Sequence, residues 1–195
     1  NDPKDRRFHA QPNACPDCGP GLTLLNDKLE KINVPDAISE VCRLLKDGKI
    51  VAIKGLGGYH LACDALNPDA VHRLRARKYR EYRPFAVMVR DIETAKHLCH
   101  VNEDEEKLLK SIIRPVVLLR KRPGCSVAEE VAPYQKYHGI MLPYTPLHHL
   151  VVAESELVLV MTSGNVSSEP IVYQDEEAFE RLKNIADVYC CLLYT

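Results

Sequence analysis

Strand, turn and strand follow one another in Ile50-Val51-Ala52-Ile53-Lys54-Gly55-Leu56-Gly57-Gly58-Tyr59-His60-Leu61-Ala62-Cys63-Asp64-Ala65. The first four residues form an apolar run typical of a buried strand, and residues 59–65 predict a second strand. Three glycines in four positions lie between them, so the backbone can turn sharply and approach a ligand closely. Lys54 ends the first strand and is placed to point at a phosphate. A plain β-hairpin turn explains the same segment equally well.

Helix-like and strand-like patterns alternate on both sides of this stretch. Upstream, the apolar side chains at positions 38, 41, 42 and 45 have the spacing of one helix face, and Gly48 is placed to end that helix. Downstream, Asn67 and Pro68 are typical of a helix start, and this helix should run to about Lys78. Further strands are expected at residues 85–90, 115–120, 157–161 and 188–193, and further helices at residues 91–98, 103–112, 145–151 and 175–186. Residues 122–142 are expected to form a long, functional loop.

The alternation predicts an α/β domain whose helices cover a mostly buried sheet. The chain has 195 residues, of which 46% are apolar, and its formal net charge is −1. No apolar run approaches the ~18 residues that a membrane-spanning helix needs, so no membrane contact is expected. Most of the eight cysteines stand among apolar neighbours, which favours free thiols in a cytoplasmic protein. The chain does not begin with Met, and we expect a piece excised from a longer protein.

Residues 1–30 differ from the rest because they are rich in Pro, Asn and Gly and show no sustained periodicity. Cys15 and Cys18 have the spacing of a zinc knuckle, but zinc requires four ligands and the sequence holds no second Cys-x-x-Cys pair. They form half a site, expected to stay metal-free unless another pair is supplied. We therefore predict two parts: the C-terminal part of a zinc-finger-like module at 1–30, and one α/β domain at 31–195.

Cations are concentrated around the end of the helix that begins at Pro68. They are Arg75, Arg77, Lys78, Arg80 and Arg83, and residues 85–89 directly after them are apolar. Because the whole chain is nearly neutral, this concentration is local, and phosphate is the first polyanion that it would hold. A solvated helix end is the alternative, and it accounts for most runs of charge.

Small polar side chains follow the predicted strand at 157–161. Thr162, Ser163 and Asn165 supply hydroxyl groups and a carboxamide, which can hydrogen-bond a ribose, a base or a phosphate oxygen. In open α/β sheets, ligands bind beyond the carboxyl ends of strands, which favours a binding role. The same residue types are also common in ordinary turns.

Two pairs of residues, taken together, resemble a known family. Lys78-x-Arg80 and Ser163-x-Asn165 match the Lys-x-Arg and Ser-x-Asn pairs of the YrdC/TsaC nucleotide-binding domains. The surrounding sequence is similar to one branch, the hydrogenase-maturation carbamoyltransferases of the HypF type. The matching phrases include Cys15-Pro16-Asp17-Cys18-Gly19-Pro20, Arg83-Pro84-Phe85-Ala86-Val87-Met88 and Met141-Leu142-Pro143-Tyr144-Thr145-Pro146-Leu147-His148-His149.

The resemblance implies a fold and a reaction. The fold would be a twisted mixed β-sheet with flanking helices and a concave basic nucleotide-binding cleft. The reaction would form carbamoyl-adenylate from carbamoyl phosphate and ATP with Mg²⁺, and would pass the carbamoyl group to HypE. The chain lacks the other domains of that family, so we expect it not to turn over by itself. Zinc would bind only with the missing Cys pair.

The resemblance also implies roles for individual residues. Lys78 and Arg80 would hold the triphosphate, Thr162, Ser163 and Asn165 the nucleotide and its Mg²⁺–phosphate region, Lys54 the carbamoyl side, and Arg114 and His60 would line the same cleft. Two alternatives stay open: synthesis of threonylcarbamoyl-AMP, which uses the same nucleotide site, and binding of double-stranded RNA or tRNA. The near-neutral net charge argues against RNA.

Overall fold

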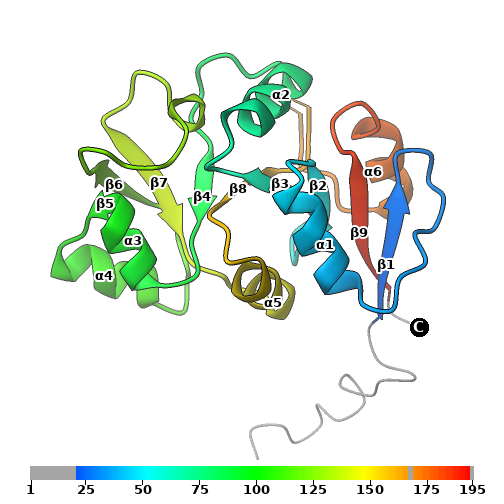
Figure 1. Cartoon of the computed structure of the whole chain (residues 1–195), viewed down its shortest axis with the longest axis horizontal. Helices are drawn as coiled ribbons and strands as arrows, with labels where there is room; N and C mark the ends of the chain where they lie inside the picture. The colour runs from blue at the N-terminus through cyan, green and yellow to red at the C-terminus, as the bar shows by residue number, and fades with distance from the viewer. Residues whose placement is uncertain (1–20, 167–168, 194–195) are drawn as a thin grey trace, which may run out of the picture.

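The structure is a computed structural model that describes residues 21–166 and 169–193. The half site expected at Cys15 and Cys18 lies outside these residues. Over the described ranges, one sheet carries helices on both faces (Figure 1). Its nine strands are β1 (Gly21–Asn26), β2 (Val51–Lys54), β3 (Tyr59–Asp64), β4 (Ala86–Met88), β5 (Cys99–His100), β6 (Val117–Lys121), β7 (Tyr137–Met141), β8 (Leu159–Ser163) and β9 (Val188–Leu193). The helices are α1 (Ala37–Lys46), α2 (Pro68–Lys78), α3 (Ile92–Leu98), α4 (Glu103–Lys110), α5 (Pro146–Ser155), α6 (Asp175–Arg181) and the short 3₁₀ helix η2 (Glu129–Val131).

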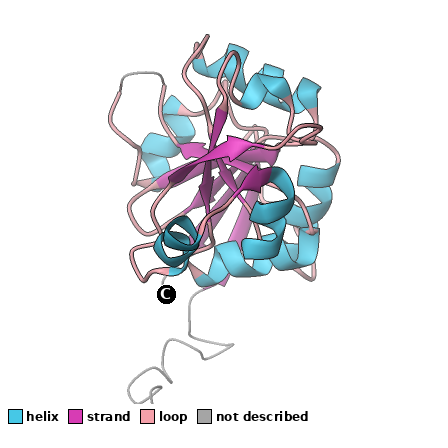
Figure 2. Cartoon of the chain, turned by 90° about the vertical axis from the view of Figure 1, so that its left-hand side faces the viewer, coloured by secondary structure: helices cyan, strands magenta, loops and turns pink. Residues whose placement is uncertain are grey.

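The strand order is β1-β9-β2-β3-β8-β4-β7-β6-β5. Strand β9 runs parallel to β2, and β4 runs parallel to β7, whereas the other neighbouring strands are antiparallel. The sheet is thus mixed, and helices flank it on both sides (Figure 2). The expected α/β class with a mixed sheet and flanking helices is confirmed.

The glycine-rich stretch forms a hairpin. Strand β2 pairs antiparallel with β3, with Lys54 opposite Tyr59, and the residues between them make the turn. Gly55 donates its backbone N–H to the carbonyl oxygen of Gly58 at 2.8 Å, which closes the turn. The hairpin alternative for this stretch therefore describes the structure.

Side chains alternate between the two faces of the sheet and build two cores. Ile50, Ala52 and Tyr59 pack on one face with α2, α3 and α6. Ile53, Ala62 and Met161 pack on the other face with α1 and α5. Positions on one strand that differ by one residue therefore face different surroundings, which decides where each polar side chain at a strand end can reach.

Helix α2 places the concentrated cations. The Asn67 side chain caps its start by accepting from the backbone N–H of Ala70, and Pro68 occupies the first turn. The helix ends at Lys78 because Tyr79 takes a left-handed conformation with φ 51°. Arg75, which is buried, then donates to the backbone carbonyls of residues 80, 81 and 83 and thereby fixes the loop that carries Arg80.

Several expected bounds differ from the structure. The stretch 122–142 is not one loop, because residues 137–141 form β7 between β4 and β6. The strand expected at 157–161 extends to Ser163, because Thr162 and Ser163 pair with Leu61 and His60 of β3. The last helix ends at Arg181, well before residue 186. Strand β1 lies within the range 1–30, yet it pairs with β9 in the sheet. The boundary after residue 30 stays a prediction.

No helix among the described residues has the length and apolar character needed to cross a membrane. The cysteines that the structure describes are free thiols, and all of them except Cys125 are buried.

Candidate functional site

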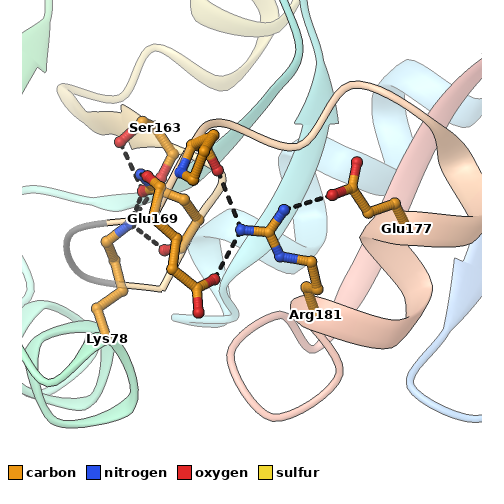
Figure 3. Close-up of polar contacts among 7 residues, drawn as sticks. Lys78, Ser163, Glu169, Glu177 and Arg181 are labelled. Carbon is orange, nitrogen blue, oxygen red and sulfur yellow. Dashed lines mark hydrogen bonds and ion pairs between the residues drawn. The ribbon is translucent and has the colours of Figure 1, made fainter.

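The ammonium group of Lys78 joins α2 to the end of β8. It donates to the backbone oxygens of Ser163 and Asn165 at 2.6 and 2.7 Å and to the Asn165 side-chain oxygen at 3.0 Å (Figure 3). Three N–H donors are all that an ammonium group has, so these contacts use its full capacity. The Lys78 side chain is completely buried. The two segments expected to converge are therefore in direct contact, although they lie far apart in the sequence.

The turn after β8 is shaped by short backbone contacts. The N–H of Gly164 donates to the carbonyl oxygen of Tyr59 at 2.6 Å, and a Cβ atom at Gly164 would lie 2.6 Å from that same oxygen. Glycine is therefore required here by close approach of two strands. Within the turn, the Ser163 hydroxyl donates to the Asn165 side-chain oxygen at 2.8 Å. This arrangement leaves Ser163 and Asn165 with defined orientations at the carboxyl end of β8.

Arg80 and Ser163 line the same cavity, which measures about 300 Å³. Thr162 also lines it, and its apolar part includes Phe85, Val116, Leu118 and Met161. The Arg80 guanidinium donates to backbone carbonyls of Arg83 and Pro84 and lies 5.0 Å from the Phe85 ring centroid. The cavity thus combines a fixed cation and hydroxyl groups with an apolar wall, which suits a ligand that is anionic at one end and aromatic at the other.

Burial changes the proton equilibria of the cations at this site. It lowers the pKa of Lys78 to about 8, and the nearby Arg80 contributes in the same direction. The pKa of Arg80 is also lowered by burial and by Arg83. The acceptors of Lys78 are neutral oxygens, so its positive charge is not cancelled by a carboxylate among the residues that the structure describes.

A second set of polar contacts holds the segment beyond the turn (Figure 3). The Asn165 carboxamide donates to the backbone oxygen of Glu169 at 2.6 Å. Arg181 of α6 lies between two carboxylates, contacting Glu169 at 2.6 Å and also pairing with Glu177. It donates to the Pro170 carbonyl oxygen at 3.2 Å as well. Sequence reasoning missed this link. The Glu177–Arg181 spacing signals an ion pair on a helix, but no pattern identifies Glu169 as a third member.

Lys54 is not brought to this cavity. It shares a face of the sheet with its cross-strand neighbour Tyr59, and its ammonium pairs with Asp175 at the start of α6. The Tyr59 hydroxyl donates to the same carboxylate at 2.7 Å. His60 and Ser163 project from the opposite face. Strand alternation turns Lys54 toward α6, where it holds an ion pair with Asp175. Its expected role on the carbamoyl side stays a prediction that this geometry does not favour.

Two other cations of the sequence analysis also have structural contacts. Arg114 adopts a positive φ of 48° and donates to the Leu109 carbonyl oxygen at 3.2 Å, and it is not among the residues that line the cavity. Arg77 pairs with Asp187 at 2.8 Å, which ties α2 to the segment before β9. The run from Arg75 to Arg83 is therefore neither a solvated helix end nor a single phosphate cluster. Its members divide between holding the fold and facing the cavity.

Three rings gather next to Ser163. His60 lies opposite Ser163 across β3 and β8, and its Nε2 atom lies 3.0 Å from the Tyr144 hydroxyl. The ring of His148 packs edge-on against both, with centroids at 5.6 Å from His60 and 4.6 Å from Tyr144. The sequence pointed only to His60 as a member of the cleft. The i, i+4 spacing of Tyr144 and His148 around a helix start is the signal that could have linked them.

The chain is similar to known proteins in sequence. The family model of Sua5, YciO and YrdC proteins, described as telomere recombination, matches residues 43–191, and the HypF finger model matches residues 1–25. Carbamoyltransferase HypF of Rhodobacter capsulatus is 50% identical over 188 residues, covering 96% of this chain and 25% of the relative. Threonylcarbamoyl-AMP synthase of Bos taurus is 27% identical over 145 residues, covering 73% of this chain and 51% of the relative.

A solved structure of full-length HypF in the phosphate- and nucleotide-bound form superposes with a TM-score of 0.90 at 50% identity. The match covers 99% of this chain and 25% of that one, so the chain spans about a quarter of the length of its HypF relatives. The family match, the finger match and the nearly complete coverage of this chain agree with one another. The chain belongs to the Sua5–YciO–YrdC family, in the branch of the HypF carbamoyltransferases.

Proposed function

We propose that this chain binds ATP in the cavity beside Ser163 and forms carbamoyl-adenylate there. One observation carries the proposal: Lys78 binds the turn that follows β8, and Arg80 and Ser163 line one cavity. A fixed cation and a hydroxyl group thus line a space of about 300 Å³, and the buried Lys78 ammonium group, which no carboxylate among the described residues balances, holds the turn beside it. The nucleotide-bound state of the related HypF structure supports the same class of ligand.

The proposed net reaction converts carbamoyl phosphate, ATP and water into carbamoyl-adenylate, pyrophosphate and phosphate. Water releases phosphate from carbamoyl phosphate, and an oxygen of the resulting carbamate bonds to the α-phosphorus of ATP. The bond between that phosphorus and the pyrophosphate oxygen breaks. Negative charge spreads over the phosphate oxygens as this happens, and cations already fixed in place stabilise it.

The residues in and beside the cavity have different roles in this reaction, according to where each side chain lies. Arg80 faces the cavity with a guanidinium group held by two backbone carbonyls, so it offers its remaining N–H groups to phosphate oxygens. The Ser163 hydroxyl lies at the same end. Lys78 orients the turn from behind and adds positive potential, rather than making a direct contact in this conformation. The apolar side chains of Val116, Leu118 and Met161 suit the base.

Magnesium is expected to accompany the triphosphate. Mg²⁺ keeps several waters and takes one or two carboxylates together with phosphate oxygens. At the turn, Ser163 and Asn165 supply neutral oxygens, and the Glu169 carboxylate is paired with Arg181. The described residues hold no group of three or more His, Cys, Asp or Glu side chains suited to a metal. The residues therefore fit an ion held chiefly by phosphate and water, which would neutralise charge on the triphosphate when bound.

Calorimetric titration of this chain with Mg·ATP tests the proposal, with Arg80→Ala as the variant and Arg90→Ala as the matched control. Arg90 is an exposed arginine that pairs with Asp91 at 3.0 Å, at a distance from the cavity residues along β4. We expect a roughly tenfold loss of affinity for Arg80→Ala, because a charge-assisted hydrogen bond contributes ~1.5–3 kcal/mol. Unchanged affinity in Arg80→Ala, or the same loss in Arg90→Ala, would refute the site.

The acyl donor separates two possible reactions. The HypF branch points to carbamoyl phosphate and to HypE as the acceptor of the carbamoyl group, and we adopt both in the proposal. The bovine relative points to threonylcarbamoyl-AMP as the alternative product. Pyrophosphate release from ATP is therefore measured with carbamoyl phosphate and, separately, with L-threonine plus bicarbonate. Release only with the second mixture would replace the first reaction by the alternative.

A further inference from the structure

The three rings of His60, Tyr144 and His148 form a compact cluster (the ring cluster) on the face of the sheet that carries α5. Each pair of rings meets edge to face, at interplanar angles of 67° to 89°. Tyr144 packs against the core that contains Met161 and Leu147, so the cluster is anchored on the same side as those residues. His148 is only 1% exposed, whereas His60 and Tyr144 are partly exposed.

The register of the sheet places the ring cluster beside the proposed nucleotide site. His60 and Ser163 are directly opposite one another in the antiparallel pair β3–β8. Directly opposite residues project from the same face, with Cβ atoms about 5 Å apart. Ser163 lines the cavity, whereas His60 is its cross-strand neighbour and is not among the lining residues, so the ring cluster lies beside the cavity at the Ser163 end.

The ring cluster has hydrogen-bonding capacity that the described part of the chain does not use. Both ring nitrogens of His148 and the Nδ1 atom of His60 are buried without a partner among the described residues. Buried polar atoms nearly always have a partner, which can be a bound polar molecule. Burial, together with His60 and His149, lowers the pKa of His148 to about 4, so this ring is neutral near pH 7. Burial also lowers the pKa of His60, so the ring next to Ser163 is neutral near pH 7 as well. A neutral imidazole offers one donor and one acceptor, which matches an uncharged amide.

The ring cluster also leaves little space. The His60 ring packs directly on the turn of the hairpin, and a Cβ atom at Gly55 would lie 2.8 Å from its Nδ1 atom. On its other side it contacts Tyr144, which is itself backed by His148. The rings therefore support one another, and His60 cannot shift away from Ser163 without displacing a neighbour. A group bound between Ser163 and this wall must be small.

We infer that the ring cluster recognises the acyl end of the substrate, hydrogen-bonding a small amide such as carbamoyl and excluding acyl groups that carry an amino-acid side chain. This inference rests on the proposed function, because it assigns the end of the same site that lies beyond the phosphates. His60 and Tyr144 form the wall that meets the acyl group. His148 is a positioning residue that holds both rings from behind.

Three variants separate size from hydrogen bonding. His60→Ala removes the wall, Tyr144→Phe keeps the ring but removes the hydroxyl, and His149→Ala changes the exposed neighbour of His148 as the matched control. Calorimetry with a non-hydrolysable ATP analogue measures nucleotide binding, and carbamoyl phosphate is then titrated into that complex. Acetyl phosphate, which has a methyl group in place of the amide nitrogen, and inorganic phosphate serve as comparison ligands. Thermal unfolding confirms that each variant is folded.

We expect all three variants to bind the ATP analogue within about twofold of the unaltered chain. Tyr144→Phe and His60→Ala should weaken carbamoyl phosphate binding by about tenfold, the effect of one lost hydrogen bond to a polar group. The unaltered chain should prefer carbamoyl phosphate to acetyl phosphate, and Tyr144→Phe should reduce this preference. His60→Ala should also gain measurable binding of L-threonine in the presence of bicarbonate.

The outcomes distinguish the inference from the proposed function. Failure of the unaltered chain to bind the ATP analogue would remove the proposed function and the inference with it. Normal nucleotide binding with carbamoyl phosphate bound equally by all variants, or not bound at all, would overturn the inference alone. If inorganic phosphate binds as well as carbamoyl phosphate, the amide is not recognised and the inference is also overturned. If His60→Ala or Tyr144→Phe loses structure, His148→Asn, which retains a polar side chain, provides the same comparison of carbamoyl and acetyl phosphate.

Discussion

Lys54 and Lys78 occupy similar places in the chain but have opposite electrostatic surroundings. Each is the last residue of a regular element, and each has an ammonium group bound by protein oxygens. Lys54 meets the carboxylate of Asp175, so the pair carries no net charge. Lys78 meets only neutral oxygens of Ser163 and Asn165 among the described residues. The first arrangement stabilises a contact between elements, whereas the second keeps a positive charge inside the protein.

The difference shows which lysine can attract an anion. A neutral ion pair has a weak field beyond its immediate surroundings, whereas a single buried charge acts strongly through a medium of low dielectric constant. Keeping that charge has a cost, which is visible in the lowered pKa of Lys78. A fold that tolerates such a cost at the end of a strand, next to a cavity, is typical of a functional site.

The replacement Lys78→Met removes this charge while keeping a side chain of similar length, and should have the largest effect. We expect ATP affinity to fall by about 100-fold, since ~3 kcal/mol of electrostatic attraction and orientation of the turn are lost. Stability should fall by about 1–3 kcal/mol, because the three oxygen atoms lose a buried donor. Calorimetry and urea unfolding measure the two quantities. Lys110→Met is the control, since Lys110 also ends a helix but is exposed and pairs with Glu106. Equal losses of affinity in both variants would contradict the role of Lys78.

The pH dependence of ATP binding should follow Lys78. Its pKa is lowered to about 8, so below pH 8 the ammonium form predominates and affinity is full. Above that value the charge is lost, and affinity should fall by roughly tenfold between pH 7 and pH 9. The contribution of Lys78 to the free energy of unfolding should instead rise with pH between pH 8 and 10.5. In this range the unfolded chain still binds the Lys78 proton while the folded chain has lost it, so raising the pH favours the folded chain.

Buried thiols with raised pKa values, such as Cys42, lower stability over the same alkaline range. The informative quantity is therefore the difference in unfolding free energy between the unaltered chain and Lys78→Met. Lys78→Arg provides the control for binding, because a guanidinium stays protonated at pH 9 and should remove the decline in affinity. A decline of the same size in Lys78→Arg would assign it to another group.

Arg181→Ala should weaken ATP binding more modestly, by about threefold, because Arg181 acts on the turn only through Glu169 and Asn165. Arg181→Lys keeps the charge and should restore part of the affinity. Arg43→Ala is the matched control, since Arg43 also lies between two carboxylates, Glu40 and Asp47, on an exposed helix. Calorimetry at two salt concentrations tests the idea. If Arg181→Ala changes the unfolding midpoint but leaves ATP affinity unchanged, its contacts serve the fold alone.

Elements with strong local sequence patterns could be predicted, and elements without such patterns could not. Strands such as Val51–Lys54 and Leu159–Ser163 have buried apolar runs, and α2 has a clear capping residue, so their existence could be inferred. Strand β7 could not, because Tyr137, His138 and Gly139 show no apolar pattern. It becomes a strand by pairing with β4 and β6, which lie far away in the sequence. Residues 137–141 have no clear strand propensity of their own, so their strand conformation is set by tertiary contacts.

The candidate site was predictable in its residue types but not in their directions. The motif pairs identified Lys78, Arg80 and Ser163, which the structure brings together. The same reasoning also assigned Lys54 to the site, which stays a prediction, since the sequence shows that Lys54 ends a strand but not which face it occupies. Alternation has a period of two residues, so an uncertainty of one position in register reverses the face. Register depends on pairing with β3, which no local pattern reports.

Lys54→Met should have the smallest effect on ATP binding and so completes the comparison. We expect affinity within about twofold of the unaltered chain, because Lys54 is not among the residues that line the cavity and its ammonium group pairs with Asp175. Its removal leaves Asp175 with the Tyr59 hydroxyl as a partner, so stability should fall by about 1–2 kcal/mol, between the values for exposed and buried pairs. Urea unfolding of Lys54→Met, Asp175→Asn and the double variant measures the coupling between the two charges. A coupling near zero would show that the pair adds nothing to stability, and a large loss of ATP affinity in Lys54→Met would return this lysine to the site.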